Sequence, residues 1–370
     1  MNYFLNDDRI ILYILSTLYA FGAVKIRYLY DNIYPLSRIF DVEDRNLVAT
    51  MQLSQKQEFQ LREATENLEE IAQGYYKLAE KDIKFITFLD DNYPYRLKFF
   101  HDAPASLYYK GELPSDISPA IAVVGSRNAT SYGKSMTEYL CSNLAKSGVQ
   151  IISGMAHGID SYAHRGALSS DGKTYAVLGN GLNICYPPEN MDIFTLMSDS
   201  EHGGVISEYP LGTPGIARNF PMRNRIISGL SDMVIVVEAK EKSGSLITAD
   251  MALDQGRDVY AVPGRMNDPL SKGCNQLIKK GAGIITSVDD VFEILGYIKN
   301  GDISLPQKDV SSLSGKSKIV YNYLDLHPKY IEEISSDTGI PLSEAMEIVL
   351  DLELAGFIEQ ISGNYYGIRM

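Results

Sequence analysis

The middle of the chain contains short segments in which nearly every residue is Val, Ile, Ala or another apolar type. Half-exposed strands alternate apolar and polar residues, whereas near-continuous apolar runs are typical of strands that are buried on both faces of a parallel sheet. The segments between the runs have the length of crossover helices. The runs are IAVVG (121–125), VQIISG (149–154), TYAVLG (174–179), GVISEY (204–209), MVIVVEA (233–239), DVYAVPG (258–264) and GIITS (283–287). The sequence therefore predicts an α/β domain with a doubly wound, mainly parallel sheet.

Most of these runs end in a turn that is rich in Gly. Ligands of doubly wound sheets bind outside the carboxyl ends of the strands. We therefore expect the turns and the loops that follow the strands to converge on one binding site.

Composition restricts the ligand. The chain has 370 residues and a formal net charge of −13, and 45% of its residues are hydrophobic, which is enough to form a substantial core. A general phosphate-binding surface needs a broad basic field. Any nucleic-acid site must therefore be a local cluster of Arg and Lys. The three cysteines, Cys141, Cys185 and Cys274, are far apart and lack the spacing of a disulfide framework or a zinc site.

The longest uncharged apolar run extends from Ile10 to Val24. It is shorter than the roughly eighteen residues of a membrane span. Asp7, Asp8 and Arg9 precede it and do not form the basic segment of a signal peptide. We expect a buried helix, no membrane association and a cytoplasmic protein.

Changes in pattern along the chain predict four segments. Residues 1–75 have helical periodicity, as in Ile11, Ile14, Leu15 and Leu18, and residues 76–298 form the α/β core. Residues 299–315 are polar, with Ser, Gly and Pro306, and are typical of a linker. Residues 316–370 show three helical segments followed by a hairpin with Gly363-Asn364 at its turn, which predicts a winged helix.

The first turn of the core contains Gly125, Ser126 and Arg127 between a strand and a helix. Free backbone N–H groups and the helix dipole favour an anion there, and Arg127 adds a formal charge. Gly133-Lys134-Ser135 is not a Walker A motif because the loop before it is three residues too long. A tight βα turn with a structural Gly is the alternative.

The second turn contains Ser153, Gly154 and Gly158. Its His157, Asp160 and His164 resemble metal-ligand spacing, but no further ligand of the usual kind lies nearby, so we expect no metal. We expect Asp160 to cap a helix, and Gly154 and Gly158 to admit a ligand backbone.

The third turn is Gly179-Asn180-Gly181. It lacks the third Gly of the dinucleotide fingerprint, and we therefore expect no nicotinamide or flavin cofactor.

The most informative segment is basic and contains Arg218, Phe220, Arg223, Asn224 and Arg225. Guanidinium groups bind phosphate through paired hydrogen bonds, and an aromatic ring stacks on a base. We favour a ligand-binding role for Arg218 and Arg223 and a buried ion pair for Arg225. The alternative for the whole cluster is pairing with the acidic residues Glu208, Asp232 and Glu238.

The last loop, Lys242-Ser243-Gly244-Ser245, joins a strand to a helix. Ser243 and Ser245 are expected either to cap that helix or to hold a phosphate oxygen. No nucleophile with a base and an orienting acid stands out in the core, which indicates a binding protein rather than an enzyme.

At these turns the sequence resembles the DNA processing protein A family (DprA, also called Smf). The resemblance extends over about residues 90–296. It is carried by NYPYRL (92–97), VVGSRNATSYG (123–133), SGMAHGIDSYAHRGAL (153–168), VLGNGLNICYPPEN (177–190), GGVISEYPLGTPG (203–215), NFPMRNRIISGL (219–230), EAKEKSGSLITADMALDQGRDVYAVPG (238–264) and KGCNQLIKKGAGIITS (272–287).

This resemblance implies a non-enzymatic recombination mediator of natural transformation. Such a protein binds incoming single-stranded DNA, protects it and helps to load the RecA recombinase. The family also implies an extended Rossmann-like core that forms a homodimer, a SAM-like helical N-terminal domain and a winged helix. The residues expected to contact single-stranded DNA are Gly125, Ser126, Arg127, Ser153, Gly154, Gly158, Gly179, Asn180, Gly181, Arg218, Phe220, Arg223, Asn224, Lys242, Ser243, Gly244 and Ser245.

Leu277, Ile278 and Ile284 are the candidates for the dimer interface, and completion of the core is their alternative role. In the winged helix, the third helix carries acidic residues and no Lys or Arg. Such a helix repels phosphates, so we interpret the winged helix as a protein-interaction module.

Two other functions stay open at this point. A Rossmann-like enzyme or sensor of the N-glycoside hydrolase type would bind a small nucleotide, and Glu208 and Glu238 are its candidate carboxylates. A pure interaction scaffold is less compatible with the arginine-rich segment.

Overall fold

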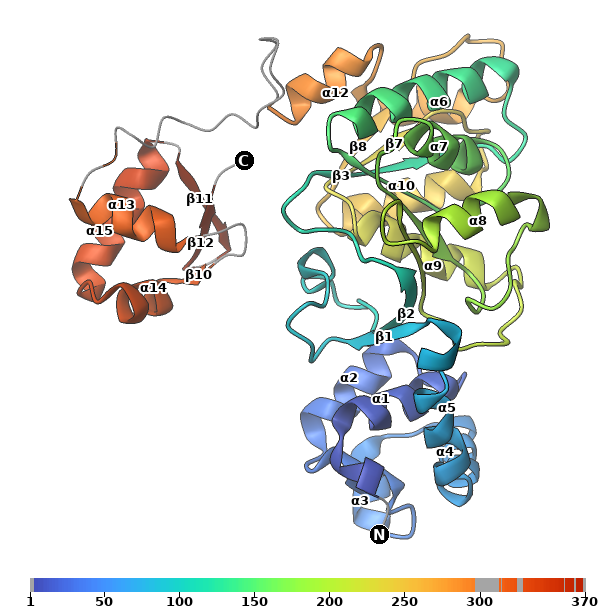
Figure 1. The fold of residues 1–370 in the computed structure, drawn as a ribbon, viewed down its shortest axis with the longest axis vertical. Coiled ribbons are helices and arrows are strands. Elements are labelled where there is room, and N and C mark those ends of the chain that lie inside the picture. The colour runs from blue at the N-terminus through green and yellow to red at the C-terminus, as the bar shows by residue number, and fades with distance from the viewer. Residues whose placement is uncertain are drawn as a thin grey trace. The chain divides into compact units, whose positions relative to one another are not determined.

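The computed structural model describes residues 3–296, 313, 315–324, 329–355, 357–362 and 364–368 (Figure 1). They fall into two compact units, Met1–Thr286 and Ser287–Met370, which we describe separately. The predicted boundary between residues 75 and 76 lies inside the first unit and stays a prediction. The predicted linker, 299–315, lies almost entirely outside the described residues.

A nine-stranded sheet forms the centre of the first unit, with the order β1-β2-β6-β5-β4-β3-β7-β8-β9. All pairs from β6 to β9 are parallel, and the pairs β1–β2 and β2–β6 are antiparallel. The predicted α/β fold with a mainly parallel sheet is confirmed. The strands are β1 (Lys84–Thr87), β2 (Ser106–Gly111), β3 (Ala120–Val124), β4 (Gln150–Ser153), β5 (Thr174–Leu178), β6 (Gly203–Ser207), β7 (Met233–Val236), β8 (Asp258–Ala261) and β9 (Gly283–Ile284).

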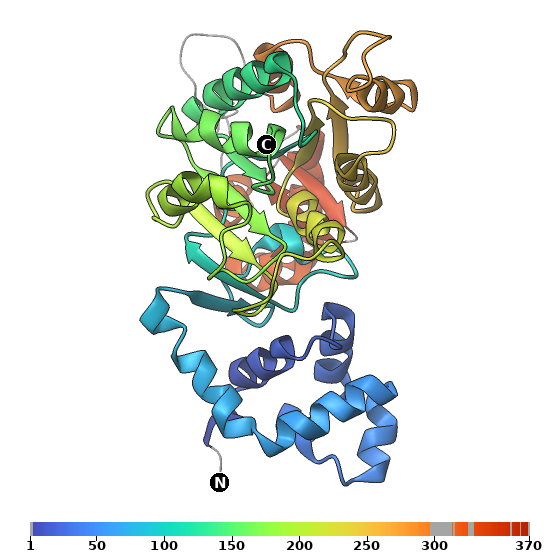
Figure 2. The ribbon, with the colours of Figure 1, turned by 90° about the vertical axis from the view of Figure 1, so that its right-hand side faces the viewer.

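Helices cover both faces of this sheet. Figure 2 shows α6, α7 and α8 on one side and α9 and α10 on the other. The chain changes sides between β3 and β7, which are neighbours in the sheet, so the connections of these two strands leave in opposite directions. Doubly wound sheets bind ligands at such a switch point. The helices are α6 (Ser131–Lys146), α7 (Ile159–Leu168), α8 (Met191–Met197), α9 (Asn219–Gly229), α10 (Gly244–Asp254) and α11 (Lys272–Lys279).

The N-terminal helices share a hydrophobic core with β2. The Ser16 hydroxyl lies 2.7 Å from the Tyr108 hydroxyl, and the rings of Tyr13 and Tyr108 make an edge contact. The single helix expected over Ile10–Val24 is wrong, because the first helix ends at Thr17 and a new one begins at Ala23. These helices are α1 (Asp8–Thr17), α2 (Ala23–Asn32), α3 (Arg45–Met51), α4 (Gln55–Glu66) and α5 (Leu68–Tyr76). No helix among the described residues is long and apolar enough to span a membrane.

Short 3-10 helices complete the first unit. They are η1 (Tyr3–Asn6), η2 (Leu36–Phe40), η3 (Ala79–Lys81), η4 (Tyr95–Leu97) and η5 (Pro188–Asn190).

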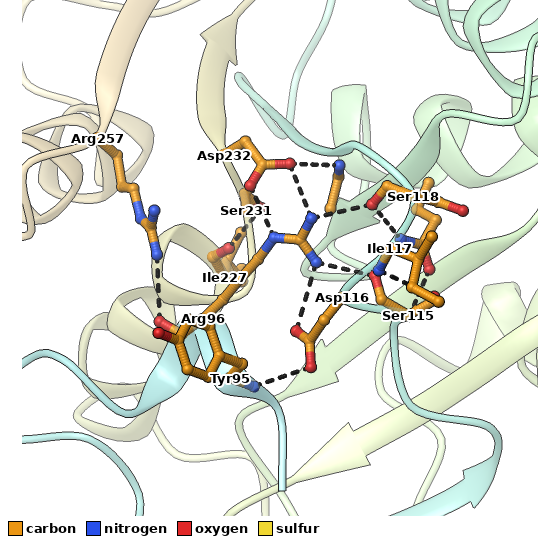
Figure 3. Close-up of polar contacts among 12 residues, drawn as sticks. Tyr95, Arg96, Ser115, Asp116, Ile117, Ser118, Ile227, Ser231, Asp232 and Arg257 are labelled. Atoms are coloured by element: carbon orange, nitrogen blue, oxygen red, sulfur yellow. Dashed lines mark hydrogen bonds and ion pairs between the residues drawn. The ribbon is translucent and has the colours of Figure 1, made fainter. Parts of the chain in front are cut away.

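A buried arginine in η4 connects the segment before β2 to the amino ends of the parallel strands (Figure 3). The Arg96 guanidinium donates to both carboxylate oxygens of Asp232, at 2.7 and 3.0 Å, and to the carbonyl oxygens of Ser115 and Ser118. Asp232 also accepts the Ala120 N–H at 2.8 Å. The charge is thus neutralised and hydrogen-bonded, as burial requires. This network lies at the edge of the sheet opposite the carboxyl ends of the strands.

The second unit contains the predicted winged helix. Helices α13, α14 and α15 and a three-stranded sheet with the order β10-β12-β11 form a separate core, and β10 lies between α13 and α14 in the chain. The predicted hairpin consists of β11 and β12, and Gly363 at its turn lies outside the described residues. The elements are α12 (Val288–Ile294), α13 (Gly315–Tyr323), β10 (Lys329–Tyr330), α14 (Ile331–Thr338), α15 (Leu342–Leu354), β11 (Ile358–Ser362) and β12 (Tyr365–Ile368).

Candidate nucleic-acid interface

A pocket of about 580 Å³ opens at the carboxyl ends of β3 and β7, where the sheet changes winding direction. It is built from the predicted loops after these two strands and the start of α9, together with residues of the segments that follow β4, β5 and β6. Its lining residues are Val124, Gly125, Ser126, Arg127, Asn128, Ala156, Asp160, Tyr186, Gly215, Ala217, Phe220, Pro221, Arg223, Asn224, Ile227, Lys240, Lys242, Ser243, Gly244, Ser245 and Thr248.

The loop after β3 is fixed by hydrogen bonds to the loop after β7. The Ser126 N–H donates to the Glu238 carbonyl oxygen at 2.7 Å, and the Ser126 hydroxyl accepts the Asn128 N–H at 3.2 Å. The Glu238 carboxylate accepts the N–H and the hydroxyl of Thr130, at 2.9 and 2.5 Å. The Thr130 hydroxyl in turn caps α6. Arg127 is left exposed on this rigid loop, beside the pocket.

Gly158 allows α7 to start against this loop. Its φ is +73°, and a Cβ there would lie 2.2 Å from the Ser126 carbonyl oxygen. A Cβ on Gly154 would lie 2.6 Å from the Arg223 guanidinium. At both glycines the space of a Cβ is occupied by other parts of the protein. The expectation that they admit a ligand backbone is therefore wrong.

Arg223 points inward and supports the wall of the pocket. Its side chain is 3% exposed and donates to the carbonyl oxygens of Gly154, at 2.7 Å, and Val177. Burial lowers the pKa of Arg223 to about 10, although the nearby carboxylate of Asp160 opposes this shift. The guanidinium therefore stays charged at neutral pH. Burial raises the pKa of Asp160, while the charge of Arg223 and the backbone N–H groups of Ala156 and Gly154 act against that rise.

Arg225 forms the buried ion pair that the sequence predicted. Its Nη2 lies 2.7 and 2.8 Å from the two carboxylate oxygens of Glu208, and its Nε lies 3.3 Å from a carboxylate oxygen of Asp102. The Arg225 side chain is 5% exposed, so its guanidinium is not available to a ligand.

Aromatic and cationic side chains gather on one side of the pocket. The ring centroids of Tyr186 and Phe220 are 5.5 Å apart, and the guanidinium carbons of Arg127 and Arg223 lie 5.3 and 5.9 Å from the centre of the Phe220 ring. Phe220 also packs against Gly179, where a Cβ would approach its ring to 2.9 Å. Tyr186, by contrast, is 42% exposed. Tyr186 is therefore better placed for base stacking than the predicted Phe220.

The loop after β7 supplies the remaining charge. Lys240 and Lys242 are exposed, and no carboxylate pairs with either ammonium group in the described part of the chain. The hydroxyls of Ser243 and Ser245 lie 2.8 Å apart at the start of α10. The two serine hydroxyls and the amino end of α10, which has eleven residues, thus line the same pocket as the lysines.

The structure divides the predicted DNA-contact residues into two groups. Those that line the pocket are Gly125, Ser126, Arg127, Phe220, Arg223, Asn224, Lys242, Ser243, Gly244 and Ser245. Those outside the lining are Ser153, Gly154, Gly158, Gly179, Asn180, Gly181 and Arg218. Arg218 is exposed at the start of α9, and the other six are buried. For example, the Ser153 hydroxyl donates to the Val123 carbonyl oxygen.

Eleven lining residues were not among the predicted contacts, and the polar, charged or aromatic ones among them are Asn128, Asp160, Tyr186, Lys240 and Thr248. Lys240 was detectable as a cation directly after the β7 run. Tyr186 lies eight residues beyond the end of β5, and only the packing of that loop against Phe220 brings it to the pocket.

The histidines of the second turn do not converge. His164 is fully buried beside the Thr174 hydroxyl, at 2.7 Å, and its pKa is lowered to about 3 by burial and by the charge of Arg223. His157 is exposed. In the described residues, no group of three or more His, Cys, Asp or Glu side chains is placed to hold a metal ion.

The candidate dimer residues differ in exposure. Leu277 is 7% exposed and Ile278 packs against the same core, as in the alternative role. Ile284 is 50% exposed on β9, the last strand of the sheet.

Comparison with known proteins identifies the family. The model of the DNA recombination-mediator protein A family matches residues 84–296, and that of the DprA winged helix domain matches residues 306–364. The protein Smf of Escherichia coli is 40% identical over 285 residues, which is 75% of each chain. The DNA processing protein DprA of Streptococcus pneumoniae is 45% identical over 216 residues, 58% of this chain and 76% of that protein.

Solved structures give the same result. The crystal structure of S. pneumoniae DprA superposes with a TM-score of 0.67 at 34% identity, and covers 77% of this chain and 97% of its own. The Helicobacter pylori DprA structure, described for its single-stranded DNA binding mode, has a TM-score of 0.52 at 31% identity and covers 58% of this chain and 95% of its own. The chain therefore belongs to the DprA/Smf family of DNA recombination-mediator proteins.

Proposed function

We propose that the protein is a DNA-processing protein that binds single-stranded DNA at the pocket between β3 and β7. The observation that carries this proposal is that Arg127, Lys240, Lys242 and the exposed ring of Tyr186 line one pocket, in a chain with a net charge of −13. A basic cluster on an acidic protein attracts polyanions to one place.

Different residues of the pocket are suited to the phosphates and to the bases of the DNA. The three cations and the start of α10 are suited to backbone phosphates, because charge and free helix N–H groups both attract anions. Tyr186 supplies a face on which a base stacks without sequence preference. The H. pylori relative, whose structure was described for its single-stranded DNA binding mode, supports this choice of ligand.

Protection of incoming DNA and loading of RecA are finer parts of the proposal, and they rest on the family resemblance. The same holds for the homodimer. Ile284 supports it because an exposed apolar residue on an edge strand is available to a second copy.

A binding role is favoured over a nucleotide hydrolase. Both candidate carboxylates are engaged within the protein, Glu208 by Arg225 and Glu238 by Thr130. Neither is among the residues that line the pocket.

Fluorescence anisotropy of a labelled poly-dT oligonucleotide tests the proposal. We expect binding that weakens as salt is added and is lost in the double variant Arg127→Ala/Lys242→Ala. The matched control is Lys77→Ala/Lys81→Ala, which removes two exposed lysines from the N-terminal helical region. Absence of binding by folded protein at low salt would contradict the proposal, as would equal loss in the control.

A further inference from the structure

The winged helix carries an apolar surface that its own core does not use. Leu342, Met346, Leu350 and Leu354 of α15 are 40, 52, 54 and 79% exposed. They are spaced by four residues, so each follows the previous one by about 40° around the helix axis and the four form one continuous ridge. We call these four residues the α15 ridge. The opposite face of α15 packs into the core through Ala345, Ile348, Val349 and Leu352.

An acidic strip borders the α15 ridge. Glu347 and Asp351 are exposed next to it on the helix surface, and α15 contains no Lys or Arg. Glu344 continues the strip and pairs with Lys316, at 2.7 Å. The surface is therefore apolar along one line and negative along the next.

This combination excludes the usual ligand of the third helix in a winged helix. Such a helix enters the major groove of duplex DNA, where phosphates line both sides. The phosphates would repel Glu347 and Asp351 there. A second copy of α15 is also unsuitable, because it presents the same acids and no cation on that helix.

We propose that the α15 ridge docks a basic amphipathic helix of a partner protein. An apolar stripe with leucines at four-residue spacing would pack against the ridge, and Lys or Arg beside that stripe would face Glu347 and Asp351. Helix recognition of this kind depends on a few apolar anchors, while charges at the border set orientation and specificity. The docking site goes beyond the DNA-binding function and does not depend on it.

Synthetic peptides test the docking site on the full-length chain. The probe is a helical 18-residue peptide with leucines at every fourth position and Lys or Arg on one flank. One control peptide has Glu in place of the cations, and another keeps the cations but has Ser in place of the leucines. We expect the probe to bind and both control peptides to fail.

Variants locate the binding. Met346→Ser/Leu350→Ser should weaken probe binding at least about tenfold, since apolar anchors carry most of such an interface. Glu347→Lys/Asp351→Lys should also weaken it, and more so at low salt. The control is Leu253→Ser, which changes a leucine of α10 that is 58% exposed. The proposal would be overturned if the acidic peptide bound as tightly as the probe, or if no peptide bound. It would also be overturned if Met346→Ser/Leu350→Ser and Glu347→Lys/Asp351→Lys both bound the probe as the wild type does. Self-association that Leu350→Ser abolishes would overturn it as well.

Discussion

The Arg223 guanidinium donates a 2.7 Å hydrogen bond to the carbonyl oxygen of Gly154, across the turn that follows β4. The contact requires Gly at position 154, because a Cβ would collide with the guanidinium. Because of this contact, the side chain of Arg223, in the basic segment, points into the protein. Among the residues that line the pocket, the exposed cations are therefore Arg127 and the lysines after β7, and this division leads to the first prediction.

Replacement of Arg223 should affect stability, whereas replacement of Arg127 should affect binding. Arg223→Ala removes the hydrogen bonds to the buried carbonyl groups of Gly154 and Val177 and takes the charge of Arg223 away from Asp160, and we expect a loss of about 3 kcal/mol in the free energy of unfolding. Arg127→Ala removes an exposed cation and should change stability by less than about 0.5 kcal/mol. Urea denaturation of both variants, beside anisotropy with poly-dT, separates the two roles. Unchanged stability of Arg223→Ala together with a large loss of poly-dT binding would assign Arg223 to ligand binding instead.

Tyr186 should contribute to DNA binding through its ring. Base–aromatic stacking is worth about 1–3 kcal/mol per base, so Tyr186→Ala should weaken poly-dT binding by about 5- to 150-fold. Tyr186→Phe keeps the ring and should bind nearly as the wild type does. Anisotropy titrations of the two variants provide the measurement. If Tyr186→Phe were as weak as Tyr186→Ala, the hydroxyl and not the ring would be the contact.

The lysines after β7 should determine much of the salt dependence. Each phosphate contact to single-stranded nucleic acid contributes about 0.7 to the slope of log affinity against log salt. Lys240→Gln/Lys242→Gln should therefore lower the magnitude of this slope by about 1.4. The titration is repeated at several salt concentrations, with Lys77→Gln/Lys81→Gln as the control. Equal slopes in wild type and Lys240→Gln/Lys242→Gln would place the phosphates elsewhere.

The sequence predicted the parallel part of the sheet because its strands are buried on both faces. Strands β1 and β2 escaped prediction, since KFIT and SLYYKG contain polar residues and no continuous apolar run. Within Ile10–Val24 the chain forms a turn with Gly22 at the amino end of α2, and local hydrophobicity did not reveal it.

The sequence indicated several of the segments that line the pocket, but it did not indicate the direction in which their side chains point. Arg127 lies in a Gly-rich turn and Arg223 in the basic segment that forms the first part of α9, yet Arg127 is exposed and Arg223 is only 3% exposed. The difference depends on tertiary contacts with Gly154 and Val177, which are far from Arg223 in the sequence. Tyr186 was missed for the same reason, because its position depends on Phe220 in another segment.

His164 should make the folded chain sensitive to acid. Its pKa is about 3 in the folded state, against 6.5 without the protein environment, because burial and Arg223 disfavour the imidazolium. Between these values the unfolded chain binds the extra proton, so stability falls as the pH drops through 6.5 and below, and it is nearly constant above about pH 7.5. Acidification from pH 6.5 to 5 should remove up to about 2 kcal/mol through this residue.

The variant His164→Gln isolates this contribution. Its amide is able to bond to the Thr174 hydroxyl, but it does not titrate, so the variant should lose less stability than the wild type over the same pH range. His101→Gln, at an exposed histidine, is the control and should behave as the wild type does. Urea denaturation at pH 7.5, 6.5, 5.5 and 5.0 gives the four free energies for each protein. Parallel curves for wild type and His164→Gln would mean that other groups cause the acid sensitivity. A smaller slope in His164→Gln alone would assign it to the buried imidazole between α7 and β5.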